Sequence, residues 1–197
     1  MTIMAPSLFV LILLASATSF RMGQRGRFKL RMQAEYEVTS DSESHKKLTF
    51  KVAGKPMSFE TGKIGRQASG AVVGTYGDSM VYSTACFDRE ATAVDFTPLR
   101  VDWFARFSAV GQTVGAFHRR DSRGDDNEIL VARLIDRPLR PMIADGWQHE
   151  TQVLSWVLSY DKVHALEPLS ICTASAAMAV SAIPFTKPVA GVELGLD

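Results

Sequence analysis

The sequence predicts an α/β domain of the mixed α+β type, and three observations lead to this fold class. The chain has 197 residues, 46% of them hydrophobic and 22% charged, a composition typical of one globular domain and unlike that of collagen or a disordered chain. From Leu48 onward, short runs of strand-forming residues are separated by glycine and proline turns, without an internal repeat. Two longer segments have the spacing of helices instead. The two cysteines form neither a disulfide framework nor a zinc spacing.

The first 46 residues differ in composition from the rest of the chain. Residues 8–15 are apolar, too short a run to span a bilayer at about 20 residues, but suited to the core of a signal peptide. Small residues follow, so we expect cleavage after Ser19. No acidic residue precedes Glu35, whereas residues 21–31 carry five basic ones, which is typical of transit peptides. We interpret residues 1–19 as a signal peptide-like segment and 20–46 as a transit peptide-like segment that ends in a polar junction packing against nothing.

This two-part leader is similar to those that direct proteins into plastids. Two alternatives remain at this point: an ordinary secretory signal followed by a basic linker, and a mitochondrial presequence. The latter fits less well because residues 1–20 contain no arginine. We therefore expect a plastid location, with the mitochondrion as the alternative, and no membrane association after the leader is removed.

The domain itself is expected to begin at residue 47, with strands joined by tight turns. Gly54-Lys55-Pro56 and Gly77-Asp78-Ser79 each separate two strand-like runs, so both predict hairpins. Pro98 indicates an edge strand or a bulge, because proline cannot donate a ladder hydrogen bond. The expected strands are 47–51, 57–61, 71–76, 80–87, 96–103, 151–160 and 189–196.

Two helices are expected, each with its own signal. Asp125 and Glu128 have the spacing of a capping box, so the first helix should cover 128–137 and end at Pro138. The second should cover 170–182 and stop before Pro184. It consists mostly of small residues and can therefore pack very closely on a sheet.

The segment from 115 to 140 is the richest in chemistry, because it holds six arginines. The planar guanidinium donates paired hydrogen bonds to phosphate and stays charged at physiological pH. An aromatic residue beside two arginines adds a stacking surface, a combination that single-stranded nucleic acid binding uses. The alternative is a salt-bridged surface helix in which Asp136 pairs with Arg133 or Arg140. The candidate RNA-binding residues are Phe117, His118, Arg119, Arg120, Arg123, Arg133, Arg137 and Arg140.

Other motifs indicate no catalytic centre in this chain. Gly62-Lys63 lacks the first glycine and the Ser or Thr of a phosphate-binding loop, and expected strands flank it where a KH clamp has helices. The four histidines are too dispersed for a metal site. No nucleophile motif or acid/base carboxylate pair is visible. The sequence thus predicts a binding surface, with no catalytic residue and no metal site.

Four motifs occur along the chain in a characteristic order. They are Glu60-Thr61-Gly62 followed by Arg66-Gln67-Ala68, then Phe96-x-Pro98-Leu99, then Gly115-x-Phe117-x-Arg119-Arg120, then Ala-Arg-Leu-Ile-Asp-Arg-Pro-Leu-Arg-Pro at 132–141. In order and spacing they resemble the first of the two RNase PH-type domains of polynucleotide phosphorylases. The resemblance covers residues 47–197. RNase PH itself and the exosome ring subunits rank second, because their string at this helix differs.

The resemblance implies both a fold and an activity. The fold would be the RNase PH type, a β-α-β arrangement similar to domain 2 of ribosomal protein S5. Such enzymes degrade single-stranded RNA from the 3′ end with inorganic phosphate as co-substrate, release nucleoside diphosphates, and assemble as homotrimeric rings. Phe117, Arg119, Arg120 and Arg123 would match the loop that grips RNA, with His118 in place of a second phenylalanine, and Arg133 and Arg137 would support the RNA path.

The resemblance also implies what this chain lacks. In the family, phosphate and a divalent ion, Mg²⁺ or Mn²⁺, bind in the second RNase PH-type domain, which is absent here. The chain ends at Asp197 inside an expected strand, so we expect it to be an N-terminal piece of a longer protein. The rival hypothesis is a non-catalytic RNA-binding or ring-scaffolding protein built from this domain alone.

Overall fold

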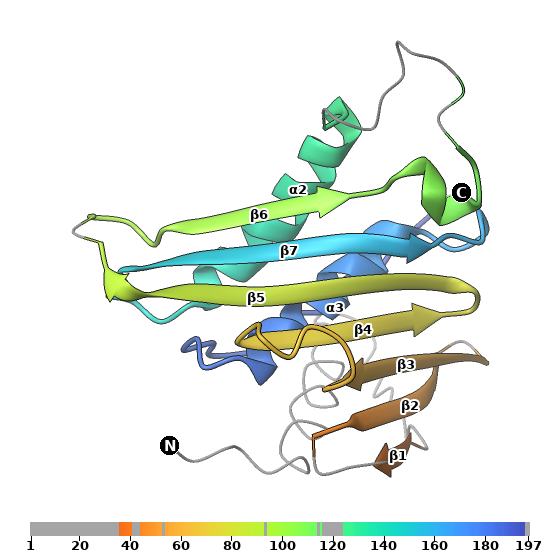
Figure 1. Ribbon diagram of the computed structural model, residues 1–197, viewed down its shortest axis with the longest axis horizontal. Coiled ribbons are helices and arrows are strands. Elements are labelled where there is room, and N and C mark those ends of the chain that lie inside the picture. The colour runs from red at the N-terminus through yellow and green to blue at the C-terminus, as the bar shows by residue number, and fades with distance from the viewer. Residues whose placement is uncertain are drawn as a thin grey trace, which may run out of the picture.

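The strands form one seven-stranded sheet in the computed structural model, which describes residues 36–40, 44–52, 54–92, 94–113, 115 and 124–195 (Figure 1). The strand order is β1-β2-β3-β4-β5-β7-β6. All neighbours are antiparallel except β6 and β7, which run parallel. The strands are β1 (Tyr36–Ser40), β2 (Lys46–Val52), β3 (Lys55–Thr61), β4 (Gly70–Tyr76), β5 (Ser79–Ala91), β6 (Leu99–Phe104) and β7 (His149–Ser159).

Both expected hairpins are confirmed. β2 pairs with β3, and β4 pairs with β5 across the turn at Gly77 and Asp78. Gly77 has a φ of 61°, a left-handed conformation that glycine adopts without a steric penalty. The sequence thus encodes this half of the sheet largely through local turns.

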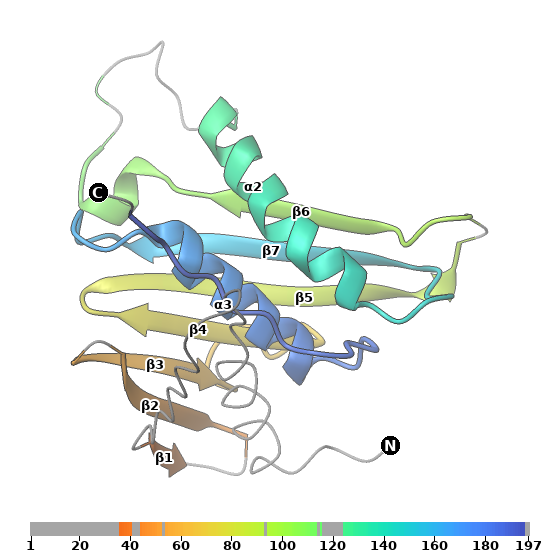
Figure 2. The ribbon, with the colours of Figure 1, turned by 180° about the vertical axis from the view of Figure 1, so that it is seen from behind.

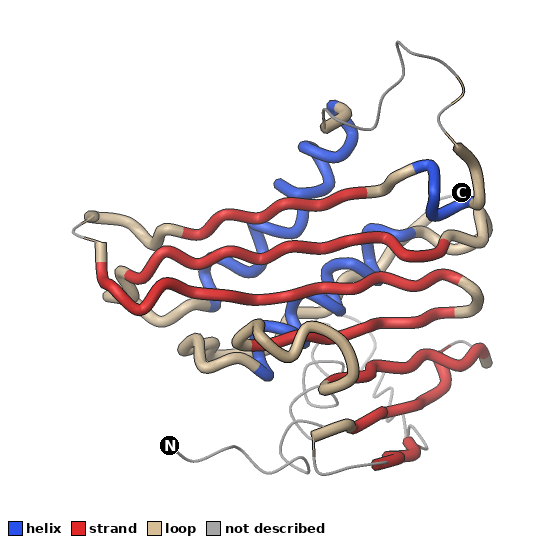
Figure 3. Tube along the Cα trace, in the orientation of Figure 1, coloured by secondary structure: helices blue, strands red, loops and turns tan. Residues whose placement is uncertain are grey.

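The parallel pair β6 and β7 is joined by a helical crossover. Helix α2 (Asp126–Leu139) and the short η2 (Arg140–Met142) lie between these strands, and the 3₁₀ turn η1 (Phe107–Val110) follows β6. Helix α3 (Leu166–Val180) follows β7. Both helices cover the same face of the sheet, α2 across β6 and β7 and α3 across β4 and β5; they lie in front of the strands in Figure 2 and behind them in Figure 3. The predicted β-α-β arrangement is confirmed.

Helix α3 packs against β4 at very short range, as its small residues predict. A Cβ atom added at Gly74 would lie 2.2 Å from the hydroxyl oxygen of Thr173, and one at Gly70 would lie 2.2 Å from the carbonyl oxygen of Ala177. The absence of a side chain at these two positions therefore sets the spacing between sheet and helix.

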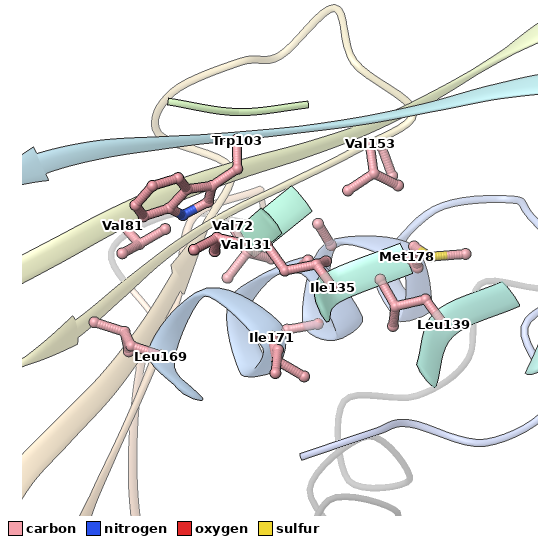
Figure 4. Close-up of a cluster of buried hydrophobic side chains, with 14 of the residues drawn as sticks. Val72, Val81, Trp103, Val131, Ile135, Leu139, Val153, Leu169, Ile171 and Met178 are labelled. Atoms are coloured by element: carbon pink, nitrogen blue, oxygen red, sulfur yellow. The ribbon is translucent and has the colours of Figure 1, made fainter. Parts of the chain in front are cut away.

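The core lies between the sheet and the two helices (Figure 4). Val81, Val153 and Val157 of the sheet are at most 1% exposed, as are Ile135 and Leu139 of α2. Buried polar groups within it are paired, because the Ser83 hydroxyl bonds that of Ser155 and the Trp103 indole N–H donates to Ser170. The Trp103 bond links edge strand β6 directly to α3.

The structure differs from the predicted elements at both ends of the domain. Residues 36–40, expected within a polar junction that packs against nothing, form β1, whose side chains are all exposed but whose backbone pairs with β2. Residues 189–195, expected as a strand, form none and run against α3. There, Val189 N–H donates to the Ser175 hydroxyl, and Gly191 packs against Ile171. This segment therefore packs along α3 instead of pairing with a strand.

The helices and strand β6 also differ from their predicted limits. α2 continues through Pro138 to Leu139, because a proline this close to the helix end removes only one backbone hydrogen bond, the one to the carbonyl of Leu134. α3 begins four residues earlier than expected, at Leu166. β6 begins directly after Pro98 and lies at the sheet edge, as that proline predicts.

Candidate nucleic-acid interface

Helix α2 carries two of the three candidate residues that the structure describes, Arg133 and Arg137, and its N-terminus is firmly held. The predicted capping box is present: the Asp125 side chain accepts from the first helical N–H groups, and Glu128 accepts from the Asp125 N–H at 3.2 Å. The second oxygen of Glu128 accepts the N–H of Ala105 at 3.0 Å. Glu128 is only 7% exposed, so it ties the start of α2 to the segment after β6.

The spacing of α2 divides it into a buried and an exposed row. Val131, Ile135 and Leu139 face the core, with exposures of 4%, 0% and 0%. Arg133 and Arg137, four residues apart, are both exposed on the outer side, as the i, i+4 relation predicts. Neither guanidinium pairs with a carboxylate within the described part of the chain. Both are therefore available for an external anion.

Arg140 behaves differently from these two arginines. Its guanidinium donates to the Asp136 carboxylate at 2.7 and 3.2 Å, and to the backbone carbonyls of Thr97 and Leu99 at 2.8 and 2.9 Å. The salt bridge left open by the sequence therefore forms between Asp136 and Arg140. Arg140 joins the end of α2 to the start of β6, and most of its donors are used inside the protein.

A groove of about 320 Å³ lies between α2 and β6. Its wall is mainly apolar, with charged groups from both elements. Arg133 contributes from α2, and Asp102 contributes from β6, where it pairs with Arg100 at 3.0 Å and accepts from Gln152. Gly124, which precedes α2, also lines the groove. The groove thus connects Arg133 with the edge strand.

Five of the eight sequence-predicted residues lie outside the described part of the chain: Phe117, His118, Arg119, Arg120 and Arg123. The described residues on either side, Gly115 and Gly124, connect this segment to η1 and to α2. Arg133, Arg137 and Arg140 remain, and the structure brings the first two together on one helix face.

Arg106 is a charged residue that sequence reasoning did not single out. Its guanidinium lies 5.0 Å from the ring centre of Phe104 and 3.8 Å from Glu128. The Phe104 ring lies 5.3 Å from that of Trp156. The Arg106 side chain is only 14% exposed, so its charge faces Glu128 of the capping box and not a ligand in solvent. The Phe104-x-Arg106 spacing could have indicated the contact between the guanidinium and the ring. The other partners, Glu128 and Trp156, lie far away in the sequence.

Among the described residues, no cluster of three or more His, Cys, Asp or Glu side chains could hold a metal ion. None of the helices formed by these residues is both long and apolar enough to cross a bilayer. Among the described residues, Arg133 and Arg137 of α2 present exposed guanidinium groups, which stay charged and can donate paired hydrogen bonds.

Comparison with known proteins agrees with the motifs. Residues 53–184 match the profile of the 3′ exoribonuclease family, domain 1 (RNase PH). The chain is 50% identical over 145 residues to the polyribonucleotide nucleotidyltransferase of Protochlamydia amoebophila, covering 73% of this chain and 21% of that protein. It is 47% identical over 146 residues to the probable chloroplastic polyribonucleotide nucleotidyltransferase 1 of Oryza sativa subsp. japonica, covering 74% of this chain and 16% of that one.

A solved structure, that of rice Rrp46, is also similar, with a TM-score of 0.48 and 16% identity over 77% of this chain and 58% of that one. The chain spans at most about a fifth of the length of the two curated relatives. The resemblance of the motifs to polynucleotide phosphorylases is confirmed by the identity to these relatives. With two thirds of its residues inside the family profile, the chain belongs to the RNase PH family of 3′ exoribonucleases, to whose first domain it corresponds.

Proposed function

We propose that this chain is the RNA-binding first RNase PH-type domain of a polyribonucleotide nucleotidyltransferase that degrades RNA by phosphorolysis from the 3′ end. The observation that carries this proposal is the 50% identity to such an enzyme over 73% of the chain. In the proposed reaction, inorganic phosphate attacks the terminal phosphodiester and a nucleoside diphosphate leaves. The substrate is single-stranded RNA.

The role proposed for this chain is to bind and orient RNA, because phosphoryl transfer depends on positioning and charge neutralisation. Arg133 and Arg137 point outward without a carboxylate partner among the described residues, which supports a role in phosphate contact. We assign Arg140 a positioning role instead, since it fixes the end of the helix that carries them.

The segment before α2 supplies the remaining contacts in this proposal. Phe117 and His118 would stack on bases, and Arg119, Arg120 and Arg123 would contact phosphates. The short distance in sequence from Arg123 to the N-terminus of α2 supports one continuous RNA path along the segment and the helix.

The catalytic centre is proposed to lie in a second RNase PH-type domain outside this chain. A divalent ion, Mg²⁺ or Mn²⁺, would there neutralise charge on the reacting phosphates. The described residues of this chain offer no ligand cluster for such an ion, so we assign no step of metal chemistry to them.

Assembly and location are proposed with the same function. A homotrimeric ring would place three copies of this domain around one RNA channel. The leader-like segments 1–19 and 20–46 and the chloroplastic name of the rice relative support a plastid, with the mitochondrion as the alternative.

The proposal is tested by substituting Arg119 and Arg120 with Ala and measuring binding of single-stranded RNA as a function of salt. We expect weaker binding and a salt slope shallower by about 1.4, since each phosphate contact contributes about 0.7 for single strands. Arg66→Ala, at an exposed arginine that donates within its own loop, is the matched control. Unchanged affinity in the double variant would favour a ring-scaffolding protein. Release of nucleoside diphosphate by the 197-residue chain alone would contradict a catalytic centre in another domain.

A further inference from the structure

A second cluster of chemically active side chains lies at the end of the sheet where β3 begins and β7 leads into α3. Lys55 of β3 places its Nζ atom 2.8 Å from Nε2 of His164, a residue 109 positions away. The other ring nitrogen of His164, Nδ1, bonds the Asp161 carboxylate. A lysine, a histidine and an aspartate therefore form a hydrogen-bonded chain, far along the sheet from α2.

The imidazole of His164 is held from several sides. Tyr76 meets it edge-on, with ring centres 4.6 Å apart and planes at 72°. Gly77 leaves no further room, because a Cβ atom there would lie 2.9 Å from the imidazole Cε1. The His164 and Asp161 side chains are 15% and 11% exposed, whereas Lys55 is exposed. The base is thus preorganised, and the amine it faces is open to solvent.

The loop that presents this pair adopts a strained backbone. Lys162, between Asp161 and His164, has a φ of 62° and is the sole non-glycine residue with positive φ in the described ranges. The strain is retained because Asp161 Oδ1 accepts the N–H groups of Val163 and His164, both at 2.9 Å. Such strain concentrates where a side chain is held for a function.

The hydrogen bonds assign the tautomer of His164. Asp161 accepts backbone N–H groups as well as the imidazole, and these bonds, that of the His164 N–H first, hold the pKa of its carboxyl well below its usual range. A carboxylate at Nδ1 requires the ring proton on that nitrogen. The lone pair of Nε2 then faces Lys55 and accepts the hydrogen bond that its Nζ donates. Nucleophile, base and orienting carboxylate therefore stand in the order that activated nucleophiles share.

We propose that Lys55 is a nucleophilic acceptor of acyl groups from acyl thioesters, with His164 as its general base and Asp161 as the positioning residue. The Lys55 ammonium first loses one proton through Nε2 of His164 to solvent, which frees the nitrogen lone pair. That pair attacks the thioester carbonyl carbon, the N–C bond forms, and the C–S bond breaks. The second proton leaves the nitrogen through His164 and is taken up by the departing thiolate. The product is a neutral amide and no redox step occurs.

The probe is acetyl-coenzyme A, incubated with the full chain, and the readout is the acetylation rate of each lysine by mass spectrometry. Lys51 and Lys187 are exposed lysines of the same molecule and serve as internal references. We expect Lys55 to react at least about tenfold faster than either, since a positioned general base contributes 10²-fold or more. Equal rates at Lys55 and the two references in the unmodified chain would overturn the proposal.

Two variants separate base catalysis from mere exposure. His164→Gln should lower the rate at Lys55 to that of the references, and Asp161→Asn should lower it partly, while Lys51 and Lys187 keep their rates. If Lys55 keeps its full rate in His164→Gln, the cluster is structural only and the proposal is wrong. Altered rates at Lys51 and Lys187 would reveal misfolding. In that case, two measurements decide whether His164 acts as a base: the rate at Lys55 relative to Lys51 and Lys187 in the unmodified chain, and the rate at Lys55 in Asp161→Asn. None of these readouts depends on RNA binding, so they are independent of the proposed phosphorolysis.

Discussion

The guanidinium of Arg140 donates to both oxygens of the Asp136 carboxylate, at 3.2 and 2.7 Å, and this pairing occupies the carboxylate that helical spacing offers to Arg133. Asp136 lies within reach of Arg133 by helical spacing, but its oxygens are bonded to Arg140. The same guanidinium also donates to two backbone carbonyls, that of Thr97 just before β6 and that of Leu99 at its start. Arg140 thus stabilises the crossover and leaves Arg133 without Asp136 as a partner.

Replacing Arg140 with Ala should therefore destabilise the domain. The change removes the side-chain donors of two backbone carbonyls and of the Asp136 carboxylate, so we expect the free energy of unfolding to fall by about 1–3 kcal/mol. Urea unfolding followed by tryptophan fluorescence measures it. Arg137→Ala, at an exposed arginine three residues earlier in α2, should change the value by less than about 0.5 kcal/mol. Equal losses in both variants would contradict the structural role of Arg140.

Glu128 should be the most costly residue of the α2 N-terminus to remove. It is buried and its carboxylate accepts the N–H groups of both Asp125 and Ala105, so Glu128→Ala leaves two donors unsatisfied. We expect a loss of about 2 kcal/mol or more in the free energy of unfolding. Glu150→Ala, at an exposed position of β7, is the control. A thermal unfolding midpoint that is lowered to the same extent in the two variants would disprove the prediction.

The contact between β4 and α3 should not tolerate a methyl group. Gly74→Ala places a Cβ atom against Thr173, and Gly70→Ala places one against the Ala177 carbonyl, each at 2.2 Å. Because helix and strand must separate to relieve the overlap, we expect a loss of about 1–3 kcal/mol, larger at Gly70, where the obstacle is backbone. Gly115→Ala enters open space and should be neutral. Chemical denaturation of the three variants would settle the comparison, and a neutral Gly70→Ala would contradict the packing.

Local signals explain which parts of this fold the sequence predicts. The turn at Gly77 and the capping box of Asp125 and Glu128 act over a few residues, and both were predicted correctly. Pro138 did not end α2. The energetic cost of a proline in a helix depends on how close it lies to the helix end, and the residues next to Pro138 do not show where that end is. Residues 189–195 have strand-like composition, but the partner they find is α3 rather than a strand.

The same distinction applies to the candidate site. The i, i+4 spacing correctly placed Arg133 and Arg137 on one exposed face. The carbonyls that Arg140 contacts lie 43 and 41 residues away, so no local pattern shows that this arginine is used internally. Likewise, Lys55 and His164 are 109 residues apart, and only the sheet topology brings them together.

Acid should weaken the fold through Asp161. Hydrogen bonds from the backbone N–H and the side chain of His164 lower the pKa of this carboxyl in the folded state. The same His164 side chain contacts Lys55 through its other ring nitrogen. A carboxyl with a lowered folded pKa contributes stability that is present above its unfolded pKa, about 3.9, and is lost as the pH falls below it. Asp161→Asn should therefore reduce the dependence of the urea midpoint on pH between about 5 and 3. Identical pH profiles for the two proteins would show that Asp161 does not contribute.

The two outward arginines of α2 should contribute to RNA affinity more than to stability. Arg133→Ala combined with Arg137→Ala removes two cations from an exposed face, so the fold should lose less than about 1 kcal/mol. If each contacts one phosphate, the slope of log affinity against log salt for single-stranded RNA should become shallower by about 1.4. Fluorescence anisotropy across a salt series measures this slope. Arg100→Ala, at an exposed arginine that is neutralised by Asp102 3.0 Å away, is the control and should leave the slope unchanged. A double variant with the original slope would mean that RNA does not follow α2, and contacts would then have to be sought in residues 116–123 alone.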